Sequence, residues 1–298
     1  MMPMTALLRF HFQASRPGLW FPTVWLYLLP LTHDGPADTA RLGSFAFWLG
    51  LLFVTFPLNH LVYGWNDLVD AETDARNPRK GSYLFGARGT PEELATLPRG
   101  MMAIQALCWP LLTFIGGWGM VPIGLAIIAF LLAYNHPTRG LRGRPPGDLL
   151  SQVGYLLTVI LSATLNGVPW PSPWVFAYLA LFCAQSQLMG EVMDIHPDRE
   201  AGRETTATQL GARGAKMLII GVVTAEIALL LGPLHDPTFA LGMAGFLAWL
   251  LLDLLVLFPA NDQQYTLNQM RLFGIFGNIC AVLSMGWVWW SGGFGHAA

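Results

Sequence analysis

Residues 59–80 read NHLVYGWNDLVDAETDARNPRK, and this stretch ends an apolar segment with three aspartates. Asp67, Asp70 and Asp74 follow a 0, 3, 7 spacing, so on a helix that advances about 100° per residue they share one face. The same face carries two polar residues upstream, Asn59 and Tyr63. We therefore predict a polar stripe that leads out of the apolar segment to a group of carboxylates.

A second acidic triplet with the same spacing lies 124 residues further on, in GEVMDIHPDREAGRETTAT. It consists of Glu191, Asp194 and Asp198, and Gln187 repeats the upstream polar position of Tyr63. Either triplet alone could be a solvated helix end. Two matched triplets would repel each other unless cations share them. Because Mg²⁺ binds carboxylates and bridges to phosphate oxygens, we predict a Mg²⁺ site that binds a diphosphate.

The composition is that of a membrane protein. The chain has 298 residues, of which 54% are hydrophobic and 11% charged, against about 25% charged in an average soluble domain. The net charge of -2 and the lack of a Lys/Arg run argue against a nucleic-acid partner. The three cysteines lie in apolar runs without metal-ligand spacing, and we expect no removable signal peptide.

Nine windows are long enough to cross a bilayer, and we predict an all-α, nine-helix membrane bundle formed by a single domain, residues 1–298. The windows are 18–33, 43–66, 101–119, 120–136, 148–168, 173–193, 216–233, 238–259 and 271–291. With a cytoplasmic N-terminus, fifteen of the sixteen Lys and Arg residues fall on the inner side, and only Arg41 lies outside. The acidic triplets would then face the cytoplasm. The loop 75–100 is expected to cap the site, with a short helix that starts after Thr90.

Basic residues near the acids are candidate phosphate donors. They are Arg76, Arg79, Lys80, Arg139, Arg142, Arg199 and Arg203. Two further acids, Glu226 and Asp253, fall inside predicted spans, where an ionisable group is costly and a functional role must be considered. We interpret both as structural groups that pair within the bundle.

The motif Asn66-Asp67-x-x-Asp70-x-x-x-Asp74 resembles the first aspartate-rich motif of the UbiA superfamily of intramembrane prenyltransferases. Asp194-x-x-x-Asp198-x-x-x-Gly202-x-x-Thr205 resembles the second. Tyr134-Asn135-x-Pro137 followed by Leu141-Arg142 is similar to a loop of that family, with Arg in place of Lys, and Ser15-Arg16-Pro17 is similar to its opening before the first helix. Asn77-Pro78-Arg79-Lys80-Gly81 departs from the segment of many quinone and chlorophyll members and looks more like the carotenoid-elongating and unassigned branches, which leaves the acceptor open.

The resemblance implies a central cavity in which Mg²⁺ joins the two motifs to an isoprenyl diphosphate, and transfer of the isoprenyl group to a lipophilic acceptor in the membrane. The acceptor would be an aromatic, a quinone precursor or a carotenoid-like molecule. The expected metal ligands are Asn66, Asp67, Asp70, Asp74, Glu191, Asp194 and Asp198, the five aspartates being catalytic. The expected substrate-binding residues are Asn59, Tyr63, Asn66, Arg76, Lys80, Tyr134, Arg142, Gln187 and Arg199.

Two other functions fit the same pattern. A terpene cyclase of the same superfamily would capture the carbocation with a double bond of its own substrate. An ion-coupled transporter could also use acidic stripes between helices. The acids lie at helix ends instead of the bilayer midplane, which argues against transport.

Overall fold

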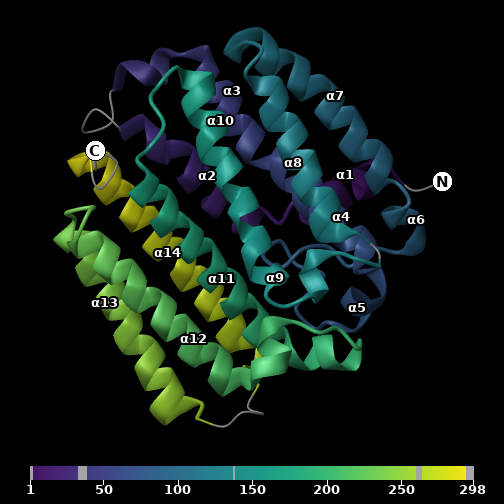
Figure 1. Cartoon of the computed structure of the whole chain (residues 1–298). Helices are drawn as coiled ribbons and strands as arrows, with labels where there is room; N and C mark the ends of the chain where they lie inside the picture. The colour runs from purple at the N-terminus through teal and green to yellow at the C-terminus, as the bar shows by residue number, and fades with distance from the viewer. Residues whose placement is uncertain (1–2, 33–38, 137, 260–263, 293–298) are drawn as a thin grey trace.

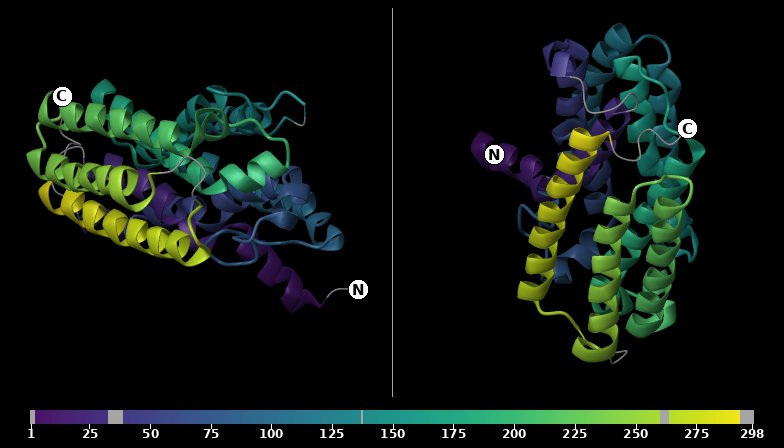
Figure 2. Two further views of the ribbon diagram at one scale, coloured as in Figure 1. Left: turned by 90° about the horizontal axis from the view of Figure 1, so that it is seen from below. Right: turned by 90° about the vertical axis from the view of Figure 1, so that its left-hand side faces the viewer.

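The computed structural model describes residues 3–32, 39–136, 138–259 and 264–292, with the side chains of Thr39 and Arg76 left out. Within these ranges the fold is all-helical, and the nearest approach to a sheet is an isolated bridge between Ser82 and Gly86. The helices run largely side by side in an elongated bundle, and α1 (Met4–Ala14) projects from one side of it (Figures 1 and 2).

The first half of the bundle ends with a tight pair of helices. Its further elements are η1 Pro17–Leu19, α2 Phe21–Leu28, η2 Leu29–Thr32, η3 Thr39–Gly43, α3 Phe45–Val54, α4 Phe56–Val69, α5 Ala71–Arg76, α6 Pro91–Leu94, α7 Leu97–Gly116 and α8 Met120–Asn135. Gly117, with a φ of +78°, ends α7 and lets the chain reverse into α8.

The second half contains the longest helices. Its elements are η4 Leu141–Gly143, α9 Gly147–Leu150, η5 Ser151–Leu156, α10 Leu157–Asn166, α11 Pro173–Glu200, α12 Thr206–Leu231, α13 Pro237–Leu252, η6 Asp253–Leu257 and α14 Leu267–Ser291. Side-chain caps mark several starts. Thr205 caps α12 and Thr266 caps α14, each with a reciprocal bond from the third residue of the helix.

Every predicted membrane window contains helix, but the structure supports a smaller number of full-length spans. Six described segments are long and apolar enough to cross a membrane: Phe45–Val69, Gly147–Asn166, Pro173–Glu200, Thr206–Leu231, Pro237–Leu257 and Leu267–Ser291. The apolar helical segments Phe21–Thr32 and Met120–Asn135 are shorter. The count of nine spans therefore stays a prediction. The short helix after Thr90 is confirmed, because Thr90 and Glu93 form a capping box at the start of α6.

The core consists of two clusters of buried apolar side chains. One is built mainly by α11, α12 and α13, and the other mainly by α3, α4, α7 and α8. Helix α2 contributes Trp25 and Leu26 to the first cluster and Tyr27 to the second. Helix α10 contributes Val159 to the first cluster and Leu161 to the second. These two helices thus form the wall between the halves (Figure 1).

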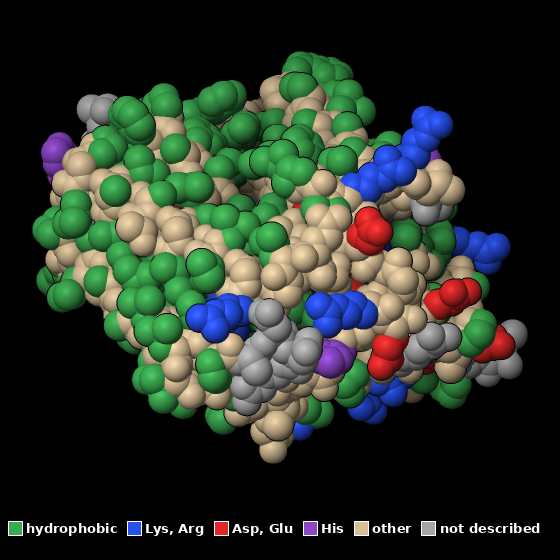
Figure 3. All heavy atoms as spheres, turned by 60° about the horizontal axis from the view of Figure 1, so that its bottom comes forward, with side chains coloured by type: hydrophobic (Ala, Val, Ile, Leu, Met, Phe, Trp, Pro, Cys, Tyr) green, Lys and Arg blue, Asp and Glu red, His purple; other side chains and the backbone are tan. Residues whose placement is uncertain are grey.

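Charged side chains gather at one end of the bundle. Figure 3 turns that end forward and shows Lys, Arg, Asp and Glu over a limited area, while much of the surface in view is apolar. The elements α5 and α9 and the ends of α4 and α11 meet at this end (Figure 1). The fold therefore brings the two acidic motifs to the same end of the molecule.

Candidate active site

The first acidic motif lies across a helix interruption that spacing alone did not predict. Helix α4 ends at Val69 and α5 begins at Ala71, with Asp70 between them at φ −94° and ψ 6°. The turn still keeps helical hydrogen bonds, from Asp70 N to Asn66 O and from Asp74 N to Asp70 O, both 2.8 Å. The three carboxylates therefore stay on one side of the chain, and all are buried.

Two basic side chains from different segments neutralise Asp67 and Asp74. Arg16 Nη2 lies 2.9 Å from Asp67 Oδ1, and Lys80 Nζ lies 2.6 Å from both Asp67 Oδ1 and Asp74 Oδ2. The Arg16 guanidinium also lies 4.4 Å from the centroid of the Tyr63 ring, a cation–π contact. A Cβ at Gly86 would lie 2.8 Å from Arg16 Nε, so glycine leaves room for this arginine.

Arg203 joins the first acidic motif to the second. Its guanidinium pairs with Asp70 and lies 3.4 Å from Asp198 Oδ1 on α11. Arg142, which follows α8, also pairs with Asp70, and its Nη1 donates a 3.3 Å bond to Asn135 Oδ1. Asp70 thus holds two guanidinium groups from loops that are 61 residues apart in the sequence.

The loop after the first motif contacts the second motif directly. Asn77 Nδ2 donates to Asp194 Oδ1 at 3.3 Å, and Arg79 pairs with Asp194. Arg88 Nη2 donates a 2.6 Å bond to the carbonyl of Asn77, which fixes the loop on itself. This loop therefore lies against the acids through Asn77, Arg79 and Lys80, and its role as a cap stays a prediction.

Burial and charge pull the pKa values of these groups in opposite directions. Burial raises the pKa of Asp74, and the ammonium of Lys80 opposes that shift. Burial alone would lower the pKa of Arg16, but Asp67 raises it above the ordinary value. Burial and the adjacent Arg203 lower the pKa of Arg142. Arg142 is therefore a cation held in an unfavourable place, which an added anion would stabilise.

Glu191 lies apart from this ion-pair cluster. Its Oε1 accepts a 3.1 Å bond from Gln187 Nε2, and its Oε2 accepts a 3.3 Å bond from the amide of Ala207 at the start of α12. Asp148 on α9 lies near Glu191 and accepts 2.6 and 2.8 Å bonds from the amide and hydroxyl of Thr206. In this structure Glu191 holds the start of α12, and Gln187 bonds to Glu191.

The other predicted substrate-binding residues occupy varied places. Asn59 is fully buried and donates 2.8 Å bonds to the carbonyls of Val54 and Thr55, so it stabilises the break between α3 and α4. The Tyr134 ring lies 5.7 Å from the Arg142 guanidinium. Arg199 is on the exposed end of α11. The side chain of Arg76 and all of Pro137 lie outside the described part.

Some site residues had no clear role in the sequence. Arg16 stood out only through the family-like opening, because its contact with Asp67 spans 51 residues. No spacing pattern in the sequence pointed to a partner for Asp148. Tyr155, which lies near Tyr63, belongs to the 3₁₀ segment η5 and was missed because the sequence of that segment is typical of an ordinary apolar span.

The acids offer oxygens suited to a hard cation, although their present partners are basic side chains. In the described ranges no three His, Cys, Asp or Glu side chains are already grouped as a metal site. Asn66 Oδ1 and Asp67 Oδ2 are nevertheless buried and have no hydrogen-bond partner among the described residues. A cavity of about 20 Å³ adjoins Asp67 and Asp74. Amide and carboxylate oxygens of this kind fit Mg²⁺.

The family follows from comparison with known proteins. The sequence model of the UbiA prenyltransferase family matches residues 19–275. The chain belongs to the UbiA prenyltransferase family. This confirms the resemblance drawn from the aspartate motifs, and it identifies the protein as a prenyltransferase and a multi-pass membrane protein.

Several curated relatives of this UbiA-family enzyme act in carotenoid synthesis. A lycopene elongase/hydratase from Corynebacterium glutamicum is 33% identical over 238 residues, 78% of this chain and 79% of that protein. Another from Haloarcula japonica is 31% identical over 70% of this chain and 69% of the relative. The C(50) beta-cyclic carotenoids biosynthesis protein LbtBC of Dietzia is 32% identical, covering 76% of this chain and 51% of that protein.

Solved structures share the fold of this UbiA-family chain. A UbiA homolog from Archaeoglobus fulgidus bound to DMAPP and Mg²⁺ has a TM-score of 0.70 at 16% identity, covering 97% of this chain and 98% of the other. The same homolog bound to GPP and Mg²⁺ has a TM-score of 0.65 at 16% identity, with 96% and 98% covered. At this identity the likeness establishes the UbiA fold.

Proposed function

We propose that this UbiA-family enzyme transfers an isoprenyl group from an isoprenyl diphosphate to lycopene or a similar linear polyene, in the membrane and with Mg²⁺. The single observation that carries the proposal is the set of basic side chains that meet the two acidic motifs in one buried cluster. The names of the curated relatives support lycopene as the acceptor. The ligands of the solved homolog support a short isoprenyl diphosphate with Mg²⁺.

The proposed division of labour follows the chemistry of the side chains. Mg²⁺, when bound, would offset the charge of the diphosphate and make it a better leaving group. Its proposed ligands are Asn66, Asp67, Asp70, Asp74, Asp194 and Asp198, with Glu191 a weaker candidate. The basic side chains would exchange their carboxylate partners for phosphate oxygens. They are Arg16, Arg79, Lys80, Arg142 and Arg203.

The reaction breaks the allylic C–O bond, and the diphosphate leaves with the electron pair. A double bond at the end of the polyene then supplies two electrons to the allylic cation, which forms the new C–C bond and moves the positive charge onto the acceptor. Loss of a proton or addition of water with loss of its proton ends the reaction, and a diphosphate oxygen takes up that proton. Tyr63 and Tyr134 carry their rings beside Arg16 and Arg142, where they are suited to face the cation.

The remaining expectations from the sequence belong to this proposal. Gln187, Arg199, Arg76 and Asn59 stay proposed substrate-side residues, of which Gln187 and Asn59 would act by positioning helices. We also propose nine spans in a single domain, 1–298, with the N-terminus and the acidic end on the cytoplasmic side of the cell membrane. The distribution of Lys and Arg supports that orientation. A reporter fused after Ala298 should be active only outside the cytoplasm.

One assay separates the candidate functions. Purified protein in lipid nanodiscs is incubated with labelled dimethylallyl diphosphate, with and without lycopene and with Mg²⁺ or EDTA. Diphosphate release that needs lycopene and Mg²⁺, together with an elongated polyene, supports the proposal. Release with a cyclised product and no acceptor would identify a cyclase. Ion flux into vesicles without diphosphate turnover would identify a transporter.

Matched variants connect that assay to the site. Asp70→Asn removes a buried acid that pairs with two arginines. Glu72→Gln removes an exposed acid two residues away in α5. The proposal requires the first change to abolish most turnover and the second to leave it near the parent. Equal effects of the two changes would separate the activity from this acid cluster.

A further inference from the structure

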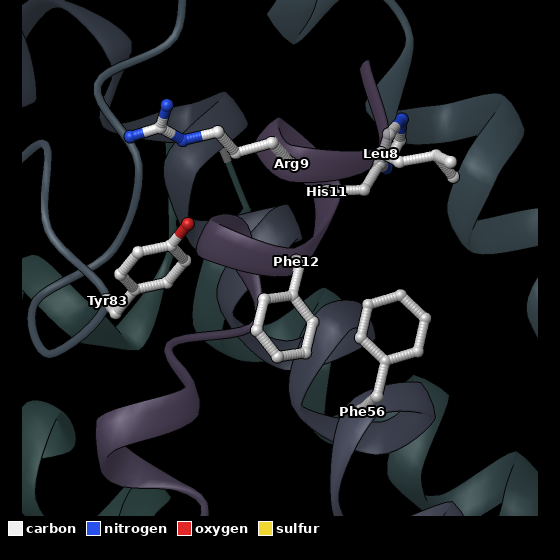
Figure 4. Close-up of a pocket in the computed structure, with 6 residues that line it drawn as sticks. All are labelled: Leu8, Arg9, His11, Phe12, Phe56 and Tyr83. Atoms are coloured by element: carbon white, nitrogen blue, oxygen red, sulfur yellow. The ribbon is translucent and has the colours of Figure 1, made fainter. Parts of the chain in front are cut away.

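A groove lies between α1, the start of α4 and the loop that carries Tyr83. It has a volume of about 560 Å³ and is lined by Leu8, Arg9, His11, Phe12, Phe56 and Tyr83 (Figure 4). Ligand pockets commonly measure about 300–1,000 Å³. The groove is therefore large enough for a substantial part of a small molecule or of a long chain.

The walls of the groove are mainly aromatic. The Phe12 ring lies 6.3 Å from the Phe56 ring and 6.1 Å from the Tyr83 ring, measured between centroids. Figure 4 shows the rings of Phe12 and Phe56 side by side with Tyr83 on the other side of Phe12. Such rings suit a flat, conjugated or unsaturated hydrocarbon.

The polar atoms of His11 are occupied elsewhere. Its Nδ1 lies 2.8 Å from Nε2 of His60, and its Nε2 lies 3.1 Å from the hydroxyl of Thr96. A ligand in the groove therefore meets the carbon edge of the His11 ring. Arg9 and the Tyr83 hydroxyl remain as the polar groups of the lining, so the groove suits a mainly apolar ligand.

One wall of the groove belongs to a candidate membrane span. Phe56 belongs to the candidate span Phe45–Val69 and precedes Asp67 by 11 residues, about 16 Å along a helix. On α1, the spacing of Met4, Leu8 and Phe12 gives one exposed apolar face, with 70%, 62% and 42% of each residue exposed. We expect this face to contact lipid, so that a membrane-dissolved molecule can enter the groove without crossing water.

Each wall of the groove belongs to a segment that also carries a residue of the acid cluster. Phe12 precedes Arg16, Tyr83 follows Lys80 in the same loop, and Phe56 and Asp67 share α4. Arg16 and Lys80 both bind Asp67. Three segments of the chain therefore link the groove to the candidate active site.

We propose that this groove binds the hydrocarbon shaft of the linear polyene acceptor while its end reaches the active site. The inference rests on the proposed function for the identity of the acceptor. Aromatic rings, occupied histidine nitrogens, a wall on a candidate span and segments shared with the acid cluster all favour a long apolar chain at this place. The part of the polyene beyond the groove would remain in the surrounding lipid.

The kinetic test compares two tryptophan variants of α1 in nanodiscs. Leu8→Trp fills the groove, and Met4→Trp adds the same bulk one turn away on the same exposed face, outside the lining. We expect Leu8→Trp to raise the KM for lycopene about 5- to 10-fold, with the KM for dimethylallyl diphosphate unchanged. Met4→Trp should match the parent. An unchanged lycopene KM in Leu8→Trp, or an equal rise in both variants, would overturn the groove assignment.

A binding measurement separates this inference from the proposed function. Cys108, Cys183 and Cys280 are replaced by Ala, and a bimane label is attached to Leu8→Cys or Met4→Cys. Lycopene without diphosphate should quench the label at position 8 at least about 3-fold more than the label at position 4. Only position 8 belongs to the lining of the groove. Transfer with equal quenching at both positions would overturn the groove while the proposed function stands. Selective quenching without transfer would support the groove and reject the proposed function.

Discussion

The two acidic motifs have the same spacing but different surroundings. The first is interrupted at Asp70, and all three of its acids are buried and paired with Arg or Lys. The second lies in the unbroken helix α11, where the Asp194 side chain is 25% exposed and Glu191 turns to the start of α12. Identical spacing thus places acids on one face, whereas residues from other segments decide what each acid does.

This difference predicts an order of importance among the acids. Asp70→Asn should reduce kcat/KM by at least about 100-fold, because Asp70 is a proposed Mg²⁺ ligand and orients both Arg142 and Arg203. Asp194→Asn should also remove most activity. The double variant should lose little more than Asp70→Asn alone, because parts of one unit are not additive. Turnover of labelled dimethylallyl diphosphate with lycopene measures all three.

Glu191→Gln sharpens the comparison within the second motif. It keeps a hydrogen-bonding side chain at the start of α12, so kcat/KM should fall by less than about 10-fold. Thermal unfolding in detergent shows that each variant is folded. A loss in Glu191→Gln as large as that in Asp194→Asn would mean that the whole triplet acts on the metal and that the two motifs are equivalent.

Arg203 is the residue that connects the two motifs, and its removal should come next in size. Arg203→Met should raise the KM for the isoprenyl diphosphate by about 10- to 50-fold, because one charged donor to phosphate is lost. Arg203→Lys should recover part of that loss, because lysine keeps the positive charge but cannot form the bidentate hydrogen bonds of a guanidinium. Arg213→Met, on the exposed surface of α12, is the matched control. Equal kinetics in the Arg203 and Arg213 variants would contradict a shared role.

The loop between the motifs should respond to ligand more moderately. Arg79 and Asn77 attach it to Asp194, and Lys80 attaches it to the first motif. Limited proteolysis within 76–99 should slow about 3- to 10-fold when diphosphate and Mg²⁺ bind, because the loop cations gain phosphate partners. Arg79→Gln should weaken this protection. If neither the ligand nor the Arg79→Gln change alters the cleavage rate, the loop is not a lid.

The smallest expected effect is a pH dependence confined to α1, far from the second motif. Burial lowers the pKa of His11 below its ordinary 6.5, and His60 faces the same ring. As pH falls below 6.5, the undocked helix takes up a proton that the docked helix resists, so docking weakens. Deuterium uptake by α1, corrected for intrinsic exchange, should rise between pH 7.5 and pH 5.5. His11→Gln should flatten this rise, and an unchanged slope would assign it to another group.

The sequence was most informative where local periodicity decides the outcome. The spacing of Asp67, Asp70 and Asp74 predicted a common side, and Thr90 with Glu93 predicted the start of α6. Local pattern did not reveal Arg16, whose partner Asp67 comes from a distant helix. Spacing along α11 placed Glu191 with the candidate metal ligands, but it could not reveal the hydrogen bond that Glu191 accepts from the amide of Ala207 in α12.

The two acids inside predicted spans show the same limit. Asp253 pairs with Lys216 at 2.6 Å and accepts a 2.7 Å bond from the Tyr265 hydroxyl, so its interpretation as a structural group fits. That partner lies 37 residues away and has no helical spacing to Asp253. Glu226 is fully buried, and neither of its oxygens has a hydrogen-bond partner in the described part of the chain. Its expected pairing is therefore not found there.

The ion pairs of the acid cluster have a consequence for biogenesis. Within the described residues, the five aspartates of the two motifs meet five basic side chains, Arg16, Arg79, Lys80, Arg142 and Arg203, so the cluster is electrically neutral by itself. A neutral cluster has a smaller desolvation cost at the membrane edge than uncompensated acids would have. Under the proposed Mg²⁺-dependent mechanism, the chain would therefore insert and fold before it meets the metal, and cellular magnesium would change turnover without changing the amount of folded enzyme.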